Sequence, residues 1–161
     1  MVTEEKIWQI LEQVSDPEIP VLTIADLGII RGIEKIDDSF KITITPTYSG
    51  CPAMRVIESE IEAALVAEGI TNITIETILS PAWTTDWLSE NGRRKLAEYG
   101  IAPPVDEPDK SILFADAPKV SCPKCHSSNT KMVSLFGSTA CKAHYQCNAC
   151  FEPFDYFKCL K

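Results

Sequence analysis

The chain has 161 residues, a length that suits one compact domain with a small appendage or two small domains. Its formal charge of −8 argues against broad binding to nucleic acid or to anionic membranes. No apolar run approaches the roughly 20 residues needed to span a bilayer, and the acidic N-terminus lacks the pattern of a signal peptide. We therefore expect a cytosolic protein whose seven cysteines are reduced.

Residues 1–100 carry the hydrophobic periodicity of a small α+β domain. Apolar side chains recur at helical spacing in three segments and alternate with polar ones in three others. Prolines in SDPEIP (15–20) end the first helix, and Gly69 ends the second. The order α-β-β-α-β-α can bury one core between a mixed sheet and the helices packed on it. The expected helices are 4–14, 52–68 and 86–98, and the expected strands are 28–36, 40–48 and 70–79.

A proline-rich, acidic segment follows this domain. It contains four prolines, which favour an extended linker, and an apolar run, Ile112-Leu113-Phe114, that is expected to pack. The charge changes sign at its end, because residues 1–117 carry 9 basic and 21 acidic side chains (−12) and residues 118–161 carry 6 basic and 2 acidic (+4). The expected parts are a domain over 1–100, a linker over 101–118 and a β module over 119–161.

Two C-x-x-C motifs, CPKC (122–125) and CNAC (147–150), lie in this module and are separated by 21 residues. Zinc favours four sulfur ligands in a tetrahedron, and two such turns at the end of a hairpin supply two thiolates each. A module of about 40 residues is too small to be stable by hydrophobic burial alone, so the metal would contribute much of its folding free energy. The pattern predicts a structural zinc ribbon, and it leaves open iron, a different set of ligands, or unliganded core cysteines. The predicted ligands are Cys122, Cys125, Cys147 and Cys150.

Four more cysteine and histidine residues in the module are surplus to a four-ligand site. His126 is more typical of the surface than of a ligand, and Cys159, in the aromatic segment FDYFKC, is more typical of a core. For Cys141, a reactive or ligating function and a structural function are equally open. No function is assigned to His144.

Cys51 stands apart from the other six cysteines, in the turn PTYSGCP (46–52). Proline is favoured at the first position of a helix, so Pro52 predicts that Cys51 is the N-cap residue. Free backbone N–H groups and the helix dipole favour a thiolate there. A join between a strand and a helix is also where α/β folds tend to place ligand sites. A small buried structural cysteine is the alternative, and local features do not decide between the two.

Three carboxylates lie in loops of the first domain, Asp16 and Glu18 in SDPEIP and Asp26 in ADLG. Loop acids more often cap a turn or face solvent than act in a site. Trp83 and Trp87 are expected in the core. Both histidines of the chain lie in the ribbon, and no phosphate-binding glycine loop or Ser/His/Asp set can be assembled. We therefore expect no catalytic residues and a protein that is not an enzyme.

Several of these motifs together resemble the SufT-like family of iron–sulfur assembly factors. With the cysteine module added, nearly the whole chain resembles the accessory proteins of the multicomponent phenylacetyl-CoA epoxidase of phenylacetate degradation. The combination of the two parts makes this resemblance specific. The first part of it rests on DPEIP (16–20), DLG (26–28), the turn Thr47-x-x-x-Cys51-Pro52 and SPAWTTDWLSENGRRKL (80–96).

The resemblance implies a small α/β fold, a function in the maturation of iron–sulfur proteins, and a key functional cysteine that corresponds to Cys51. Asp16 and Glu18 match the DPE motif of the family. The implied partners are subunits of the oxygenase, either its iron–sulfur reductase or its di-iron subunit. Iron or a transient cluster would lie at Cys51, shared across a homodimer because one thiolate per chain is too few for a stable cluster.

Two other functions stay open. The chain can be a stoichiometric subunit or electron-transfer partner of the oxygenase, which requires a stable redox centre. It can also be a nucleic-acid-binding ribbon protein, but the acidic body and the lack of a basic stripe argue against this function.

Overall fold

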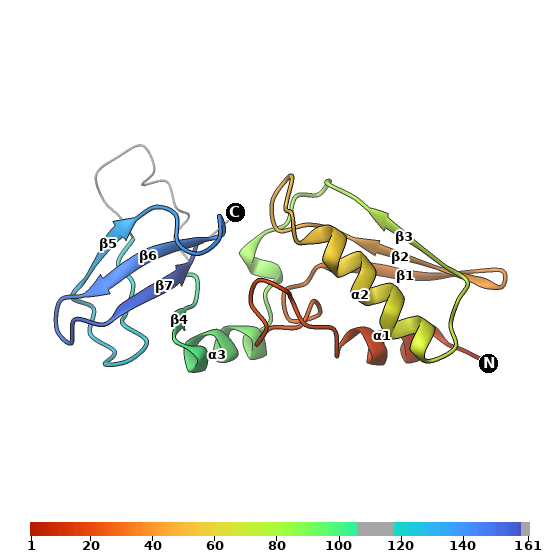
Figure 1. Ribbon diagram of the computed structural model, residues 1–161, viewed down its shortest axis with the longest axis horizontal. Coiled ribbons are helices and arrows are strands. Elements are labelled where there is room, and N and C mark those ends of the chain that lie inside the picture. The colour runs from red at the N-terminus through yellow and green to blue at the C-terminus, as the bar shows by residue number, and fades with distance from the viewer. Residues whose placement is uncertain (106–117, 159–161) are drawn as a thin grey trace. The chain divides into compact units, whose positions relative to one another are not determined.

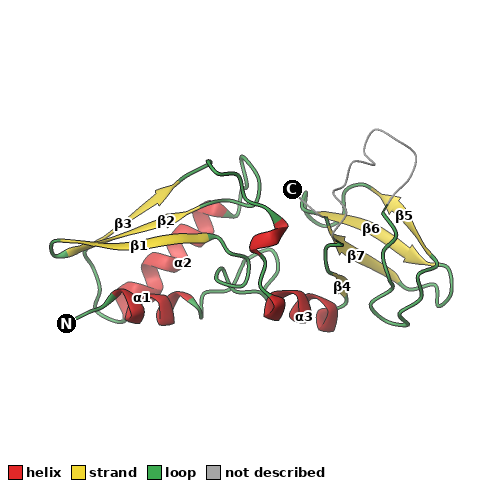
Figure 2. Ribbon diagram, turned by 180° about the vertical axis from the view of Figure 1, so that it is seen from behind, coloured by secondary structure: helices red, strands yellow, loops and turns green. Residues whose placement is uncertain are grey.

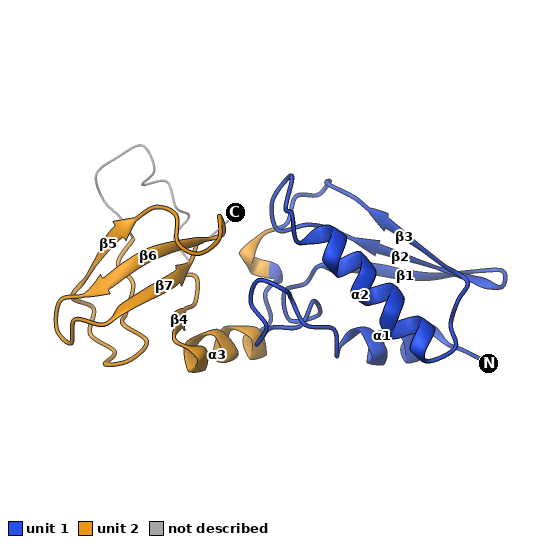
Figure 3. Cartoon of the chain, viewed as in Figure 1, with its two compact units in different colours: residues 1–83, 87–89 blue, residues 84–86, 90–161 orange. Residues whose placement is uncertain are grey.

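The computed structural model describes residues 1–105 and 118–158, which form two compact units (Figure 3). The first comprises residues 1–83 and 87–89, and the second begins with residues 84–86 and continues from residue 90. The apolar run Ile112-Leu113-Phe114 and Cys159 lie outside the described residues. None of the helices in the described part is long and apolar enough to cross a membrane.

The first unit is built on a three-stranded sheet in the order β1-β2-β3 (Figure 2). β1 (Ile30–Ile36) and β2 (Ser39–Ile44) form the expected antiparallel hairpin, and β3 (Ile73–Thr77) pairs with β2 in parallel. Side chains alternate along β2, so that Phe40, Ile42 and Ile44 are buried. The mixed sheet is therefore as predicted.

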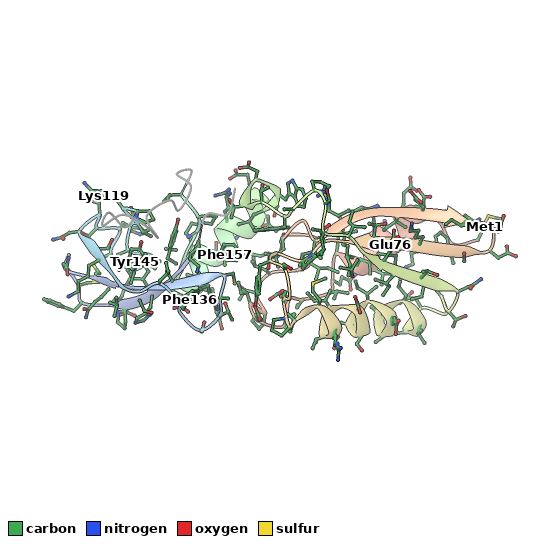
Figure 4. The ribbon with its side chains drawn as sticks, turned by 90° about the horizontal axis from the view of Figure 1, so that it is seen from above. Met1, Glu76, Lys119, Phe136, Tyr145 and Phe157 are labelled. Carbon is green, nitrogen blue, oxygen red and sulfur yellow. The ribbon has the colours of Figure 1, made fainter. Side chains whose placement is uncertain are left out.

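Two helices pack with this sheet, α1 (Glu4–Leu11) and α2 (Met54–Ala67) (Figure 1). α1 contacts both α2 and β1, and its N-cap Thr3 accepts a hydrogen bond from the Lys6 backbone N–H at 3.2 Å. Seen from above, α2 lies along one side of the strands (Figure 4). Each helix buries apolar residues at helical spacing. They include Ile7, Ile10 and Leu11 in α1 and Ile57, Ile61 and Leu65 in α2.

Several element ends differ from the expectation, among them the starts of β1 and β3 and the end of β3, and three of the differences have local reasons. The first helix ends at Leu11 because the backbone N–H groups of Gln13 and Val14 bond three residues back and tighten the chain into a turn. The strand expected over 40–48 ends at Ile44, shortly before a proline that has no N–H to donate. The helix expected from Pro52 begins at Met54, and this shift bears on the site described below.

The second unit contains α3 (Glu90–Tyr99) and a four-stranded sheet in the order β4-β7-β6-β5. A short 3-10 helix (Thr85–Trp87) precedes α3, where the sequence predicted a single helix over 86–98. The domain expected over 1–100 therefore extends beyond the first unit, since α3 belongs to the second. The strands of this sheet are β4 (Ile101–Ala102), β5 (Thr130–Ser134), β6 (Lys142–Cys147) and β7 (Pro153–Phe157).

The first two residues of the expected linker over 101–118 are part of this sheet. Ile101 and Ala102 are buried, and they pair in parallel with Asp155 and Tyr156 of β7. The core of the sheet centres on Tyr145, which is labelled in Figure 4. The Tyr145 ring stacks on Phe154 with 5.8 Å between the centroids. Together the two units give the α+β fold class predicted from the sequence, a mixed α/β sheet domain followed by a β ribbon.

Candidate functional site

The two C-x-x-C turns in the second unit have the same local geometry. In each, the residue after the second cysteine adopts a left-handed conformation, His126 with φ of 63° and Phe151 with φ of 64°. The Cys147 backbone N–H donates to the Glu152 carbonyl at 2.9 Å, and the N–H of Cys122 donates to the Ser127 carbonyl at the same distance. Each chain segment thus folds into a tight turn that presents both of its cysteines.

Pairing of β5 with β6 brings the two turns together. Asn148 follows Cys147 and donates its backbone N–H to the Asn129 carbonyl at 2.8 Å, while Lys124 and Glu152 form a salt bridge at 2.9 Å across the turns. The Sγ atoms of Cys122 and Cys150 lie 3.7 Å apart. The sulfurs of Cys122, Cys125, Cys147 and Cys150 all lie within 4.8 Å of one another.

This sulfur cluster fits a tetrahedral zinc site. Zn–S bonds of ~2.3 Å in a tetrahedron imply S···S separations of about 3.8 Å. Two of the sulfur pairs lie close to this value, Cys122 and Cys150 at 3.7 Å and Cys125 and Cys147 at 3.5 Å. Four soft sulfur donors with no oxygen ligand favour zinc over the hard cations.

The pKa values of Cys147 and Cys150 are shifted in opposite directions. The backbone N–H of Cys150 donates to the Cys147 sulfur at 3.5 Å and lowers the pKa of Cys147 to about 7. For Cys150 the backbone N–H of Glu152 lowers the pKa, but burial and the neighbouring sulfurs outweigh it and raise the pKa to about 12. At neutral pH the Cys150 thiol therefore keeps its proton unless a cation compensates the charge of its thiolate.

The described surplus residues of the module are not members of this cluster. His126 is exposed, as expected, and His144 on β6 faces Asp155, with Nδ1 3.5 Å from the carboxylate. Cys141 is buried, and its sulfur lies 3.0 Å from the Thr139 hydroxyl. Among the described residues, no second group of metal-ligating side chains is found.

Cys51 lies in the first unit, in the turn between β2 and α2. The Cys51 backbone N–H donates to the Tyr48 carbonyl, and its carbonyl accepts from the Met54 N–H, both at 3.3 Å. Gly50 supports this turn with φ of 78°, a conformation that side chains disfavour. The Cys51 side chain is half-buried, so its sulfur keeps partial access to solvent.

The expectation that Cys51 caps α2 is wrong. Ala53 occupies the N-cap position, because the chain makes one more turn after Pro52 before the helix begins. Burial raises the pKa of the Cys51 thiol. Hydrogen bonds from the Ala53 backbone N–H and from the Tyr48 side chain lower it, without cancelling the increase. The local environment therefore favours the thiol over the predicted thiolate.

Asp16 and Glu18 lie near Cys51. Their negative charges also raise the pKa of the thiol, which places both carboxylates within electrostatic range of the sulfur. Asp16 is buried and has a structural part as well, since its Oδ1 accepts the N–H groups of Glu18 at 2.9 Å and Ile19 at 2.7 Å. The fold thus brings together the three residues that the sequence selected from two distant segments.

Asp26 is a capping residue within the same unit. Its Oδ2 accepts the Thr23 backbone N–H at 3.1 Å, and its Oδ1 accepts the Ser89 hydroxyl at 3.2 Å. Trp83 is buried, as predicted, and donates its indole N–H to the Leu27 carbonyl at 2.7 Å. Trp87 is half-buried with the Arg31 guanidinium 3.5 Å above its ring. These contacts hold Trp83 and Ser89 against the DLG turn and Trp87 against Arg31 of β1.

The sequence did not predict two features of this region, the position of Tyr48 and a cleft between two helices. The Tyr48 side chain forms a hydrogen bond to the Cys51 sulfur. The only sequence feature that indicates this contact is that Tyr48 lies three residues before Cys51 in the same turn. A half-open cleft of about 680 Å³ also runs between α1 and α2, and its lining includes Asp16 and Pro17. No local sequence pattern indicates such a cleft, because its two walls lie more than 40 residues apart in the chain.

Two family models match separate parts of the chain. Residues 4–76 match the model of the iron–sulfur cluster assembly protein family, and residues 106–158 match that of the PaaD zinc beta ribbon domain. Over 96% of this chain and 92% of the relative, the sequence is 48% identical to an Escherichia coli K12 protein whose name describes a putative subunit of 1,2-phenylacetyl-CoA epoxidase. It is 34% identical to a Porphyromonas gingivalis protein named "Fe-S protein maturation auxiliary factor", over 58% of this chain and 90% of that protein.

Solved structures resemble the first part of the chain. A DUF59 domain from Bacillus anthracis superposes with a TM-score of 0.54 and 27% identity, over 58% of this chain and 90% of that domain. A conserved hypothetical protein from Thermotoga maritima superposes with a TM-score of 0.51 and 32% identity, over 59% and 94% of the two chains. The fold of the assembly domain is therefore one already seen in solved structures.

Proposed function

Because the chain belongs to the same family as the putative phenylacetyl-CoA epoxidase subunit of Escherichia coli, we propose that it is an accessory maturation factor of that epoxidase. It assists the assembly of an iron–sulfur cluster or iron centre in another subunit and does not catalyse epoxidation. Its match to the iron–sulfur cluster assembly family and its similarity to Fe–S protein maturation auxiliary factors support this proposal.

The observation that carries the proposal is the environment of Cys51. The sulfur is half-buried and accepts hydrogen bonds from the Ala53 N–H and the Tyr48 side chain, and it lies near the carboxylates of Asp16 and Glu18. A raised pKa keeps the free thiol protonated and unreactive. A bound iron ion would reverse this balance, because a cation favours the thiolate and is attracted by the two carboxylates.

In this proposal iron or a cluster is the cargo. One thiolate supplies one of the four ligands that an iron–sulfur cluster usually takes, so Cys51 holds its cargo only together with ligands from a second copy or from the client. Such incomplete ligation favours transfer over storage. The clients that we propose are the iron–sulfur reductase and the di-iron subunit of the oxygenase.

The ribbon would hold zinc through Cys122, Cys125, Cys147 and Cys150, which fit it by their chemistry and spacing. When bound, zinc supplies folding free energy and ties the two turns together, without a chemical step. Thiolate ligands and a free Cys51 require a reducing compartment, and we therefore propose a cytosolic location.

The test is to express the epoxidase subunits with the wild-type chain or with Cys51→Ser. We expect the variant to fold and to bind zinc as the wild type does, while the client subunits contain less iron and the epoxidase is less active. Cys141→Ser, which changes a cysteine outside both sites, is the control and should support full maturation. Normal iron content and activity with Cys51→Ser would refute the proposal.

A second function is favoured by the name of the Escherichia coli relative, which calls that protein a subunit. A stoichiometric subunit or electron-transfer partner would remain in the purified epoxidase at a fixed ratio. In the electron-transfer case, iron and charge-transfer absorption would be found at the ribbon cysteines. A colourless zinc protein that leaves the complex after maturation would support the accessory function instead.

A further inference from the structure

The cleft between α1 and α2 has the form of a binding groove for a peptide segment. Its volume is about 680 Å³, and its lining combines apolar side chains from both helices and the turn after α1, among them Ile10, Val14, Val56 and Ala64. Val56 is 46% exposed, so its apolar side chain is accessible to a partner in the cleft. The wall formed by α2 extends from Val56 to Glu68, about 18 Å at the ~1.5 Å rise per residue of a helix.

The charge around this cleft is negative. Its lining includes the acids Asp16, Glu60 and Glu68 and one base, Lys6, whose Nζ lies 3.6 Å from the Glu68 carboxylate. Residues 1–83, which form most of the unit, carry 5 basic and 14 acidic side chains, a formal charge of −9. A partner that fills the apolar lining is therefore attracted if it is basic and repelled if it is acidic.

The cleft also shares a residue with the candidate site. Asp16 and Pro17 belong to its lining, and the carboxylate of Asp16 lies within electrostatic range of the Cys51 thiol. A segment bound between the two helices therefore contacts the loop that holds Asp16. This shared residue distinguishes the cleft from the rest of the acidic surface.

We propose that the α1–α2 cleft binds a basic, amphipathic helical segment of a client protein and thereby brings that client to Cys51. This inference rests on the proposed function, because the client is the protein that Cys51 serves. The segment places its apolar face against Val56, Ala64 and Ile10, as in other helix-in-groove complexes. Its basic side chains lie near Glu60 and Asp16.

The same helix α2 offers a matched pair of test variants. Val56 and Glu60 line the cleft, whereas Val66, which is 52% exposed, and the exposed Glu62 do not. The double variant Val56→Asp/Glu60→Lys and the control Val66→Asp/Glu62→Lys therefore change the same helix by the same chemistry and the same net charge. All four positions are exposed, so neither double variant removes a buried side chain.

The probe is a fluorescein-labelled 14-residue peptide of leucine and lysine with amphipathic helical spacing, titrated with the full zinc-loaded chain by fluorescence anisotropy. We expect the cleft variant to weaken binding at least fivefold and the control variant less than twofold. Equal weakening by both variants would show nonspecific attraction to the acidic surface and would overturn the proposal. So would a wild-type dimer that Val56→Asp converts to a monomer without loss of peptide binding.

A second arm uses the epoxidase subunits co-expressed with each variant. The cleft variant should lower the iron content of the client subunits, and the control variant should not. Cys51→Ser separates the two proposals, since it should lower the iron content of the client subunits and leave peptide binding unchanged. If Cys51→Ser supports normal maturation, the proposed function fails, while the peptide titration still decides whether the cleft is a docking site.

Discussion

Burial raises the pKa of the Cys51 thiol, and the buried carboxylate of Asp16 raises it further, although the two residues belong to separate segments of the chain. Asp16 is fixed by hydrogen bonds from the N–H groups of Glu18 and Ile19, so its charge has a constant position. Cys51 is fixed by the turn between β2 and α2. The pKa of the Cys51 sulfur therefore depends on the loop that contains Asp16 as well as on its own turn, and a substitution in either one can change it.

Asp16→Asn should lower the pKa of Cys51, because the amide removes a negative charge and its carbonyl oxygen can still accept both backbone hydrogen bonds. The thiolate fraction rises with pH through this pKa, so the variant should be alkylated by iodoacetamide severalfold faster at pH 8. Its pH–rate profile should move to lower pH. Mass spectrometry of the Cys51 peptide from the zinc-loaded protein measures the rate separately from the ribbon cysteines.

Tyr48→Phe should change the pKa of Cys51 in the opposite direction. It removes a hydrogen bond that lowers the pKa of Cys51, so alkylation should become slower and the profile should move to higher pH. Glu62→Gln is the control, an exposed acid that does not act on the sulfur, and should leave the profile unchanged. A shift in the same direction for Asp16→Asn and Tyr48→Phe would contradict the assignment of these two effects.

The second prediction concerns the metal of the ribbon. We expect about one zinc per purified chain, because four sulfurs form one tetrahedral set. Cys125→Ser should abolish stoichiometric zinc and unfold the ribbon, because metal binding supplies much of its folding free energy. Metal analysis and limited proteolysis should then show rapid cleavage after residue 118, with residues 1–83 still protected.

Cys141→Ser is the matched control, since Cys141 is a buried cysteine of the same module outside the sulfur cluster. It should keep its zinc and its resistance to protease. Loss of zinc in this variant would indicate that Cys141 belongs to the ligand set. Iron in place of zinc in the wild type would favour a redox function for the ribbon.

A third prediction concerns the attachment of the segment 83–89. Gly28 has φ of 70°, and a Cβ atom there would lie 2.5 Å from the Trp87 carbonyl oxygen. Gly28→Ala should therefore destabilise the first unit by about 2 kcal/mol or more, from backbone strain and a steric clash together. Gly69→Ala meets no atom within 4 Å at φ of 78°, and it should cost only about 1 kcal/mol from strain.

Urea unfolding followed by tryptophan fluorescence measures both variants, because Trp83 and Trp87 report on this segment. Both values refer to the same unit and the same substitution, so their difference isolates the clash with Trp87. Equal loss of stability in the two variants would show that the contact at Gly28 relaxes without cost.

Local patterns predicted the parts of the molecule that depend on short-range interactions. The spacing of Ile57, Ile61 and Leu65 predicted one buried face of α2, and alternation predicted the hairpin of β1 and β2. The exact start of α2 was not predictable in this way. A proline is compatible with the first helical position but does not require it, and the chain uses Pro52 in a preceding turn.

The sequence by itself determined the fold class, the two C-x-x-C turns and the choice of Cys51, Asp16 and Glu18 as candidates, because periodicity, ligand spacing and family motifs are local properties. Only the tertiary structure decided that these three residues share one environment, that this environment favours the thiol, and that Asp16 also lines a cleft between α1 and α2. The reason is physical: pKa values and clefts depend on burial and on charges from distant segments, which come together only when the chain folds.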